Sequence, residues 1–104
     1  MRTLHHIGIP TSEKKANENY MEGAKLHVTD VNDSANKIEW LRFEDGSPLP
    51  ELLQKSTHIA YVVDDLAAGM LGKEVLMDPF SPAEGLTVGF IVEEGIPIEL
   101  MQYA

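Results

Sequence analysis

Hydrophobic and polar positions alternate along much of the first half of the chain, as they do in half-buried β-strands. Residues 4–10 alternate in this way and predict a first strand, which a proline ends. Residues 12–21 carry a thin apolar stripe at helical spacing behind two hydroxyl residues suited to capping, and they predict a helix. Turn-rich segments separate three further predicted strands, at residues 25–31, 37–43 and 49–54.

The same order of elements restarts in the second half. A run rich in β-branched residues at 57–63 predicts a strand, and two aspartates then introduce a helix over residues 66–71 that a glycine ends. Three strands are predicted after this helix, with a proline-containing loop at 78–82 behind the first of them, at residues 75–77, 86–92 and 96–103. The pattern predicts strand, helix and three strands, twice over.

Two short sequence matches support this repeat. His6-Ile7-Gly8 and His58-Ile59-Ala60 are 52 residues apart, and Glu51-Leu52-Leu53-Gln54 and Glu99-Leu100-Met101-Gln102 are 48 residues apart. Each match falls at the same place in its half, at the first strand for the histidine and at the last strand for the glutamate. The chain is therefore interpreted as two copies of one unit.

Composition limits the size and chemistry of the protein. A chain of 104 residues with 43% hydrophobic content has room for one folded domain. We expect a single domain over residues 1–104, with a first module at 1–55 and a second module at 56–104. The chain has no cysteine, which excludes disulfides, thiolate metal ligands and thiol nucleophiles.

Charge excludes a second group of functions. The formal net charge of −9 repels phosphates, so a nucleic-acid partner is not expected. No apolar run approaches a membrane span, and the first residues do not form a signal peptide, so we expect no membrane partner and a cytoplasmic location. A homodimer is an open expectation, because a small chain leaves sheet edges and apolar surface to cover.

The repeated residues are suited to binding a metal. If the first and last strands of each module are neighbours, then His6 and Glu51 converge with His58 and Glu99. Two imidazoles and two carboxylates form a mixed nitrogen and oxygen set, which suits Zn²⁺, Ni²⁺, Co²⁺, Mn²⁺ or Fe²⁺. Each histidine shares its face of the strand with a small residue two positions on, which leaves space beside the metal.

Simpler interpretations of these residues stay open. The four could be histidines at strand edges and exposed glutamates that repeat only because a gene was duplicated. His5 takes the place of His6 if the register is shifted by one residue, since such a shift reverses the face of a strand. His27 lies alone in a polar strand, and the default interpretation is a surface histidine.

Three stretches of the sequence resemble the vicinal oxygen chelate superfamily, which includes glyoxalases, bleomycin resistance proteins and dioxygenases. They are Leu4-His5-His6-Ile7-Gly8-Ile9, the run from Thr57 to Leu66, and Ile96-Pro97-Ile98-Glu99-Leu100-Met101-Gln102. The resemblance implies an α+β fold of two βαβββ modules that form a curved mixed sheet around a central cleft. It assigns His6, Glu51, His58 and Glu99 as metal ligands, a set similar to that of glyoxalase I-like lyases.

The implied activity is that of a metal-dependent lyase, isomerase or epimerase, similar to lactoylglutathione lyase. Its small-molecule substrate would chelate the metal through two neighbouring oxygens and lose a proton next to a carbonyl. The resemblance makes Glu99 the first choice for the base and Glu51 the second. With only two arginines available to bind anionic groups, a small, weakly charged and oxygen-rich substrate is expected.

Other functions of the same fold remain alternatives. A non-catalytic protein of the resistance type would bind a small molecule in the same cleft without turnover. An Fe²⁺-dependent ring-cleaving dioxygenase would consume oxygen. A purely structural role predicts no metal and no effect of changes at His58 or Glu99.

Overall fold

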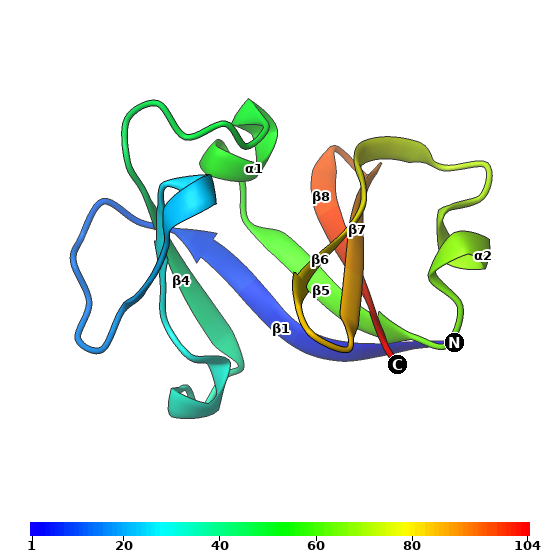
Figure 1. Ribbon diagram of the computed structural model, residues 1–104, viewed down its shortest axis with the longest axis horizontal. Helices are drawn as coiled ribbons and strands as arrows, with labels where there is room; N and C mark the ends of the chain where they lie inside the picture. Colours follow the sequence, from blue (N-terminus) through cyan, green and yellow to red (C-terminus); the bar gives the residue numbers. More distant parts are fainter.

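One mixed β-sheet contains all eight strands of the computed structural model, which describes residues 1–104 (Figure 1). The strand order is β2-β3-β4-β1-β5-β8-β7-β6. The strands are β1 (Arg2–Pro10), β2 (Asn19–Met21), β3 (Leu26–Val28), β4 (Ile38–Phe43), β5 (His58–Val63), β6 (Glu74–Ala83), β7 (Leu86–Glu93) and β8 (Ile96–Tyr103). Two five-residue helices, α1 (Glu51–Lys55) and α2 (Leu66–Met70), and two 3-10 turns, Glu22–Ala24 and Val31–Asp33, complete the elements.

The sheet consists of two halves with the same topology. In the first half β4 returns to pair in parallel with β1, and in the second half β8 pairs in parallel with β5. The antiparallel pair of β1 and β5 joins the halves, so the two sets of four strands are related by an approximate twofold axis. Figure 1 shows β1 and β5 crossing the middle of the molecule between the two halves.

The sheet is curled around a cavity. The edge strands β2 and β6 lie at opposite ends of the strand order, yet Met21 and Phe80 from these strands line the same cavity. The predicted α+β class and the curved mixed sheet around a central cleft are therefore confirmed.

The second half agrees closely with its sequence prediction. Asp65 caps α2 by accepting a hydrogen bond from the Ala68 amide, 3.1 Å away. The helix covers the outer face of the sheet, away from the cavity, and buries an apolar cluster of Val63, Leu66, Met70, Ile91, Ile98 and Leu100. One element differs, because the proline-containing segment 78–82 continues strand β6. Prolines are tolerated there because β6 is an edge strand with register shifts.

The first half differs from the prediction in two elements. The helix expected at residues 12–21 is absent: an irregular segment leads into the short strand β2, and Asn17 adopts φ 60°. Asn17 and Asn19 are poor helix formers, and a short segment with few apolar residues has little packing to maintain a helix. The strand expected at 49–54 is replaced by helix α1, since residues 51–55 are all strong helix formers, with an acidic first turn and a basic last turn.

Because of these two differences, the three strands that follow β1 begin and end one element earlier in the chain than predicted. The three strands that follow β1 are β2, β3 and β4, so the last strand of the first half is residues 38–43 and the chain leaves the sheet after it.

None of the helices of this chain is both long enough and apolar enough to cross a membrane.

Candidate metal centre

The strand registers bring four side chains together at the junction of the two halves. His6 lies opposite Ala60 and His58 opposite Gly8 in the β1–β5 pair. In the parallel pairs, Glu39 lies beside Gly8 and Glu99 beside Ala60. We name His6, Glu39, His58 and Glu99 the His–Glu cluster. Each half contributes one histidine from its first strand and one glutamate from its last.

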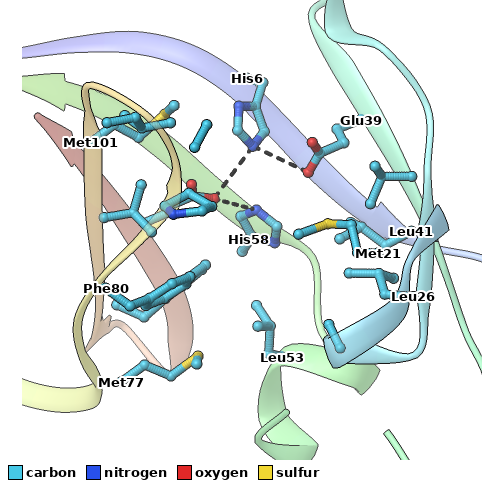
Figure 2. Close-up of a pocket in the computed structure, with 18 of the residues that line it drawn as sticks. His6, Met21, Leu26, Glu39, Leu41, Leu53, His58, Met77, Phe80 and Met101 are labelled. Atoms are coloured by element: carbon cyan, nitrogen blue, oxygen red, sulfur yellow. Dashed lines mark ion pairs between the residues drawn. The ribbon is translucent and has the colours of Figure 1, made fainter. Parts of the chain in front are cut away.

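The ring nitrogens and carboxylate oxygens of the cluster are within contact distance. Glu99 Oε1 lies 3.2 Å from His58 Nε2 and 3.5 Å from His6 Nε2. Glu39 Oε1 lies 3.5 Å from His6 Nε2. Figure 2 shows these contacts as dashed lines, with Glu39 pointing toward His6. Donor atoms of His6, Glu39 and His58 all lie within 4.8 Å of one another, which is close enough for one cation to bind them together.

The buried histidines lack ordinary hydrogen-bond partners. His6 is 3% exposed and His58 is 1% exposed. The Nε2 atoms of both rings and Nδ1 of His58 are buried and make no aligned hydrogen bond, despite the short distances to the carboxylates. Buried polar atoms almost always have a partner, and a site for an ion is one of the usual reasons for an exception. The nitrogen and oxygen donors therefore fit a divalent cation.

The pKa values of the cluster residues also favour the binding of a cation. Burial alone would raise the pKa of Glu99, but its contacts with His58 and His6 outweigh burial and hold that pKa at about 2. Burial raises the pKa of Glu39, with partial compensation from His6. Burial lowers the pKa of His6, yet Glu99 and Glu39 together bring it above its ordinary value. The side chains of Glu39 and Glu99 are 22% and 12% exposed, and no lysine or arginine lines the cavity beside them, so the two carboxylates favour a positive charge at this point.

His5 contacts the cluster from outside. A β-bulge between Leu4 and His6 places both successive histidines on the cavity side, which regular alternation would prevent. The two Nδ1 atoms lie 2.8 Å apart, and His5 Nε2 lies 3.4 Å from the Tyr103 hydroxyl. If His6 Nδ1–H donates to His5, the Nε2 lone pair of His6 is left facing the cluster. His5 then donates from Nε2 to Tyr103, which fixes both tautomers.

Gly8 is required by the position of His58. A Cβ at residue 8 would lie 2.0 Å from Cε1 of His58 and 2.5 Å from each ring nitrogen. The imidazole of His58 therefore packs directly on the backbone of β1. The corresponding position in the second half is Ala60, which is fully buried.

The structure does not bring Glu51 to the cluster. Glu51 begins helix α1, its side chain is 76% exposed, and it forms an ion pair with Lys55 one turn later. The assignment of Glu51 to a last strand was wrong, because its sequence match to Glu99 lies in a segment that forms a helix. Glu39 occupies the position that symmetry with Glu99 requires.

A signal for Glu39 was present in the sequence. Ile38-Glu39-Trp40-Leu41 has the same alternation as Ile98-Glu99-Leu100-Met101, with one charged residue between hydrophobic ones on a strand. His27, which the sequence left as a surface histidine, does not line the cavity and contacts Glu44 at 3.2 Å.

The cluster lies in the wall of a cavity of about 340 Å³. Strands of both halves form its sides, and Leu53 on α1 lies at the far end from His6 (Figure 2). A volume in this range is typical of sites for small molecules.

Comparison with known proteins shows the fold. No protein-family model matches the chain, and no curated protein matches its sequence. A solved structure of a hypothetical protein from Bacillus halodurans C-125 matches with a TM-score of 0.69 and 18% identity, over 99% of this chain and 95% of that chain. Methylmalonyl-CoA epimerase from Mycobacterium tuberculosis matches with a TM-score of 0.65 and 19% identity, over 98% of this chain and 88% of that chain. At 18% and 19% identity these matches show a shared fold, and the chemistry depends on the site.

Proposed function

We propose that this chain is a divalent-metal-dependent enzyme of the vicinal oxygen chelate type that removes a proton next to a carbonyl, as an epimerase, isomerase or lyase. The convergence of two histidines and two glutamates on one end of a cavity is the observation that carries this proposal. The shared fold with a methylmalonyl-CoA epimerase favours epimerisation among the three reactions.

The four side chains have separate roles in this proposal. His6 and His58 offer Nε2 atoms, and Glu39 and Glu99 offer carboxylate oxygens, to Zn²⁺, Ni²⁺, Co²⁺, Mn²⁺ or Fe²⁺. When bound, such a cation polarises the carbonyl oxygen of the substrate and so acidifies the neighbouring C–H bond. Glu39 takes the ligand position that the sequence assigned to Glu51.

The carboxylates also serve as proton acceptors. Inverting a carbon centre requires removal of a proton from one face and delivery to the other. Glu39 and Glu99 come from strands related by the approximate twofold axis, so they suit this division between two faces. Glu99 remains the first choice for the base, and Glu39 replaces Glu51 as the second.

The test is the metal content of untagged protein and four variants. We expect close to one divalent metal per chain in the parent and in Glu51→Ala, whose side chain is exposed and distant from the cluster. His58→Ala, Glu99→Ala and Glu39→Ala should lose the metal. Absence of metal in the parent, with no uptake of added Ni²⁺, Zn²⁺, Mn²⁺ or Fe²⁺, would contradict the proposal.

A non-catalytic binding protein is the second candidate, and the largely apolar lining of the cavity favours it. Proton exchange separates the two functions. Metal-loaded enzyme should exchange the hydrogen next to the carbonyl of an α-hydroxyketone or a malonyl thioester in D₂O, as followed by NMR. Glu99→Gln and Glu39→Gln should bind the same compounds with slower exchange, whereas a binding protein would exchange none of them.

A further inference from the structure

The cavity beside the His–Glu cluster is apolar everywhere except at one end. Of its 22 lining residues 16 are hydrophobic, and the polar side chains are those of the cluster together with His5 and the Tyr103 hydroxyl. No serine, threonine, asparagine, glutamine, lysine or arginine lines it. A ligand that fills this space finds polar partners at the cluster and hydrocarbon along the rest of its length.

Charge complementarity excludes an anionic tail. None of the eight lysines and arginines of the chain lines the cavity, and the net charge of −9 repels anions approaching from solvent. Buried carboxylates or phosphates without a cation or donor are costly. A substrate whose body carries such groups therefore does not match these walls, even though the named structural neighbour acts on a coenzyme A thioester.

The size of the cavity limits the rest of the molecule. About 340 Å³ corresponds to roughly ten water molecules, and hence to a body of about ten non-hydrogen atoms. The solvent-exposed part of the wall on β2 and β6, here called the entrance, is hydrophobic as well. Met21 on β2 and Phe80 on β6 are each 38% exposed and lie on opposite sides of the space (Figure 2). Leu53 and Val88 are buried deeper.

We propose that the substrate has two neighbouring oxygens at one end and an uncharged aliphatic or aromatic body that fills the apolar cavity. The oxygen end rests on the proposed function, whereas the apolar body follows from the lining alone. This substrate class differs from thioesters of coenzyme A and from glutathione adducts, whose bodies carry several charges.

The test is a titration of metal-loaded protein with alkyl hydroxamic acids, which present two neighbouring oxygens on a tail of variable length. Affinity should rise about threefold to fourfold for each added methylene from acetohydroxamic to octanohydroxamic acid. Analogues of equal length that end in a carboxylate should bind at least about tenfold more weakly. Affinity that is independent of tail length, or unaffected by the terminal carboxylate, would overturn the proposal.

Two variants connect this selectivity to the cavity. Met21→Arg places a cation at the entrance and should restore binding of the carboxylate-ended analogues while weakening that of the alkyl ones. Tyr20→Arg adds the same charge to the neighbouring residue of β2, which does not line the cavity, and should leave both series unchanged. Equal effects of the two variants would mean that general charge, and not the cavity, selects the ligand.

A parallel titration of metal-free protein with n-alkanols separates this inference from the proposed function. If no metal binds but alkanol affinity still rises with chain length, the metal centre fails and the apolar site stands. If metal binds but neither series depends on chain length, the apolar site fails alone. Sedimentation of the same samples reports whether the chain is a dimer. A dimer that binds no alkanol would mean that a second copy of the chain covers the cavity, and this result would overturn the proposal.

Discussion

The two halves of the sheet share their strand order but differ in what covers their outer faces. In the second half α2 buries an apolar cluster against the sheet. In the first half the corresponding face carries polar and charged side chains under the irregular segment that follows β1. Both halves nevertheless contribute one histidine and one glutamate to the cluster, so the site depends on the inner face and the strand register.

In the first half, the segment that covers the outer face of the sheet is held there by contacts of charged side chains. Leu41 faces the cavity, so Trp40 and Arg42 on the same strand face outward. Arg42 donates two hydrogen bonds to Glu18, at 2.7 and 3.0 Å, and the Lys15 ammonium lies 4.4 Å from the centre of the Trp40 ring. Such contacts near solvent contribute less than apolar burial. We therefore expect the second half to hold most of the stability.

The largest expected effect comes from truncating the outward residue that follows each glutamate of the cluster. Leu100 is fully buried in the apolar cluster, and Trp40 is its counterpart in the first half. Leu100→Ala should lower the free energy of unfolding by about 3 kcal/mol, because it removes packed methyl groups and leaves a cavity. Trp40→Ala should cost about 1 kcal/mol, since its ring is only partly covered. Urea denaturation measures both, and equal losses would refute the comparison.

The same difference explains what the sequence could predict. The strands that carry His6, His58 and Glu99 were predicted where the structure has them, and the repeated sequence matches singled out these three residues. The helix of the second half was predicted because it has a clear cap and an apolar face. Glu39 was missed because a four-residue match at Glu51 outweighed the pattern around residue 39. The helix predicted at residues 12–21 could not be rejected from the sequence of the first half alone. The segment that covers the outer face there is held by charged contacts, and such contacts leave no periodic pattern in the sequence.

A smaller effect is expected at the histidine that supports His6. His5→Ala removes the partner of His6 Nδ1, and partners of metal-binding histidines typically contribute about 10-fold to 100-fold in metal affinity. Thr57 precedes His58 as His5 precedes His6, but it is exposed, and neither ring nitrogen of His58 has a hydrogen-bond partner. Thr57→Ala should therefore leave metal affinity unchanged. Equal behaviour of the two variants in metal titrations would remove the proposed support role, and nitrogen NMR of the His6 ring would show its tautomer directly.

The smallest effect is a pH dependence confined to the first half. The hydrogen bonds from Arg42 hold the pKa of Glu18 at about 2, below its ordinary value of 4.5. A carboxyl with a lowered pKa stabilises the fold above pH 4.5, and this contribution disappears as the pH falls toward 2. Hydrogen-exchange protection factors of β3 and β4 should therefore decrease over this range in the parent. They should be lower and less dependent on pH in Glu18→Gln; an unchanged acid response in that variant would assign the effect to another group.

Gly8 carries no functional group, yet the cluster depends on it as much as on its own four side chains. The imidazole of His58 occupies the space that any side chain at residue 8 would need. Sequences that diverge from this one can exchange wall residues of the cavity for others of similar size, but they keep the His58 position only if residue 8 remains glycine. A search for related sites that scores only histidines and glutamates would overlook this requirement. The most restricted position in such a set of sequences can be one that makes no chemical contribution at all.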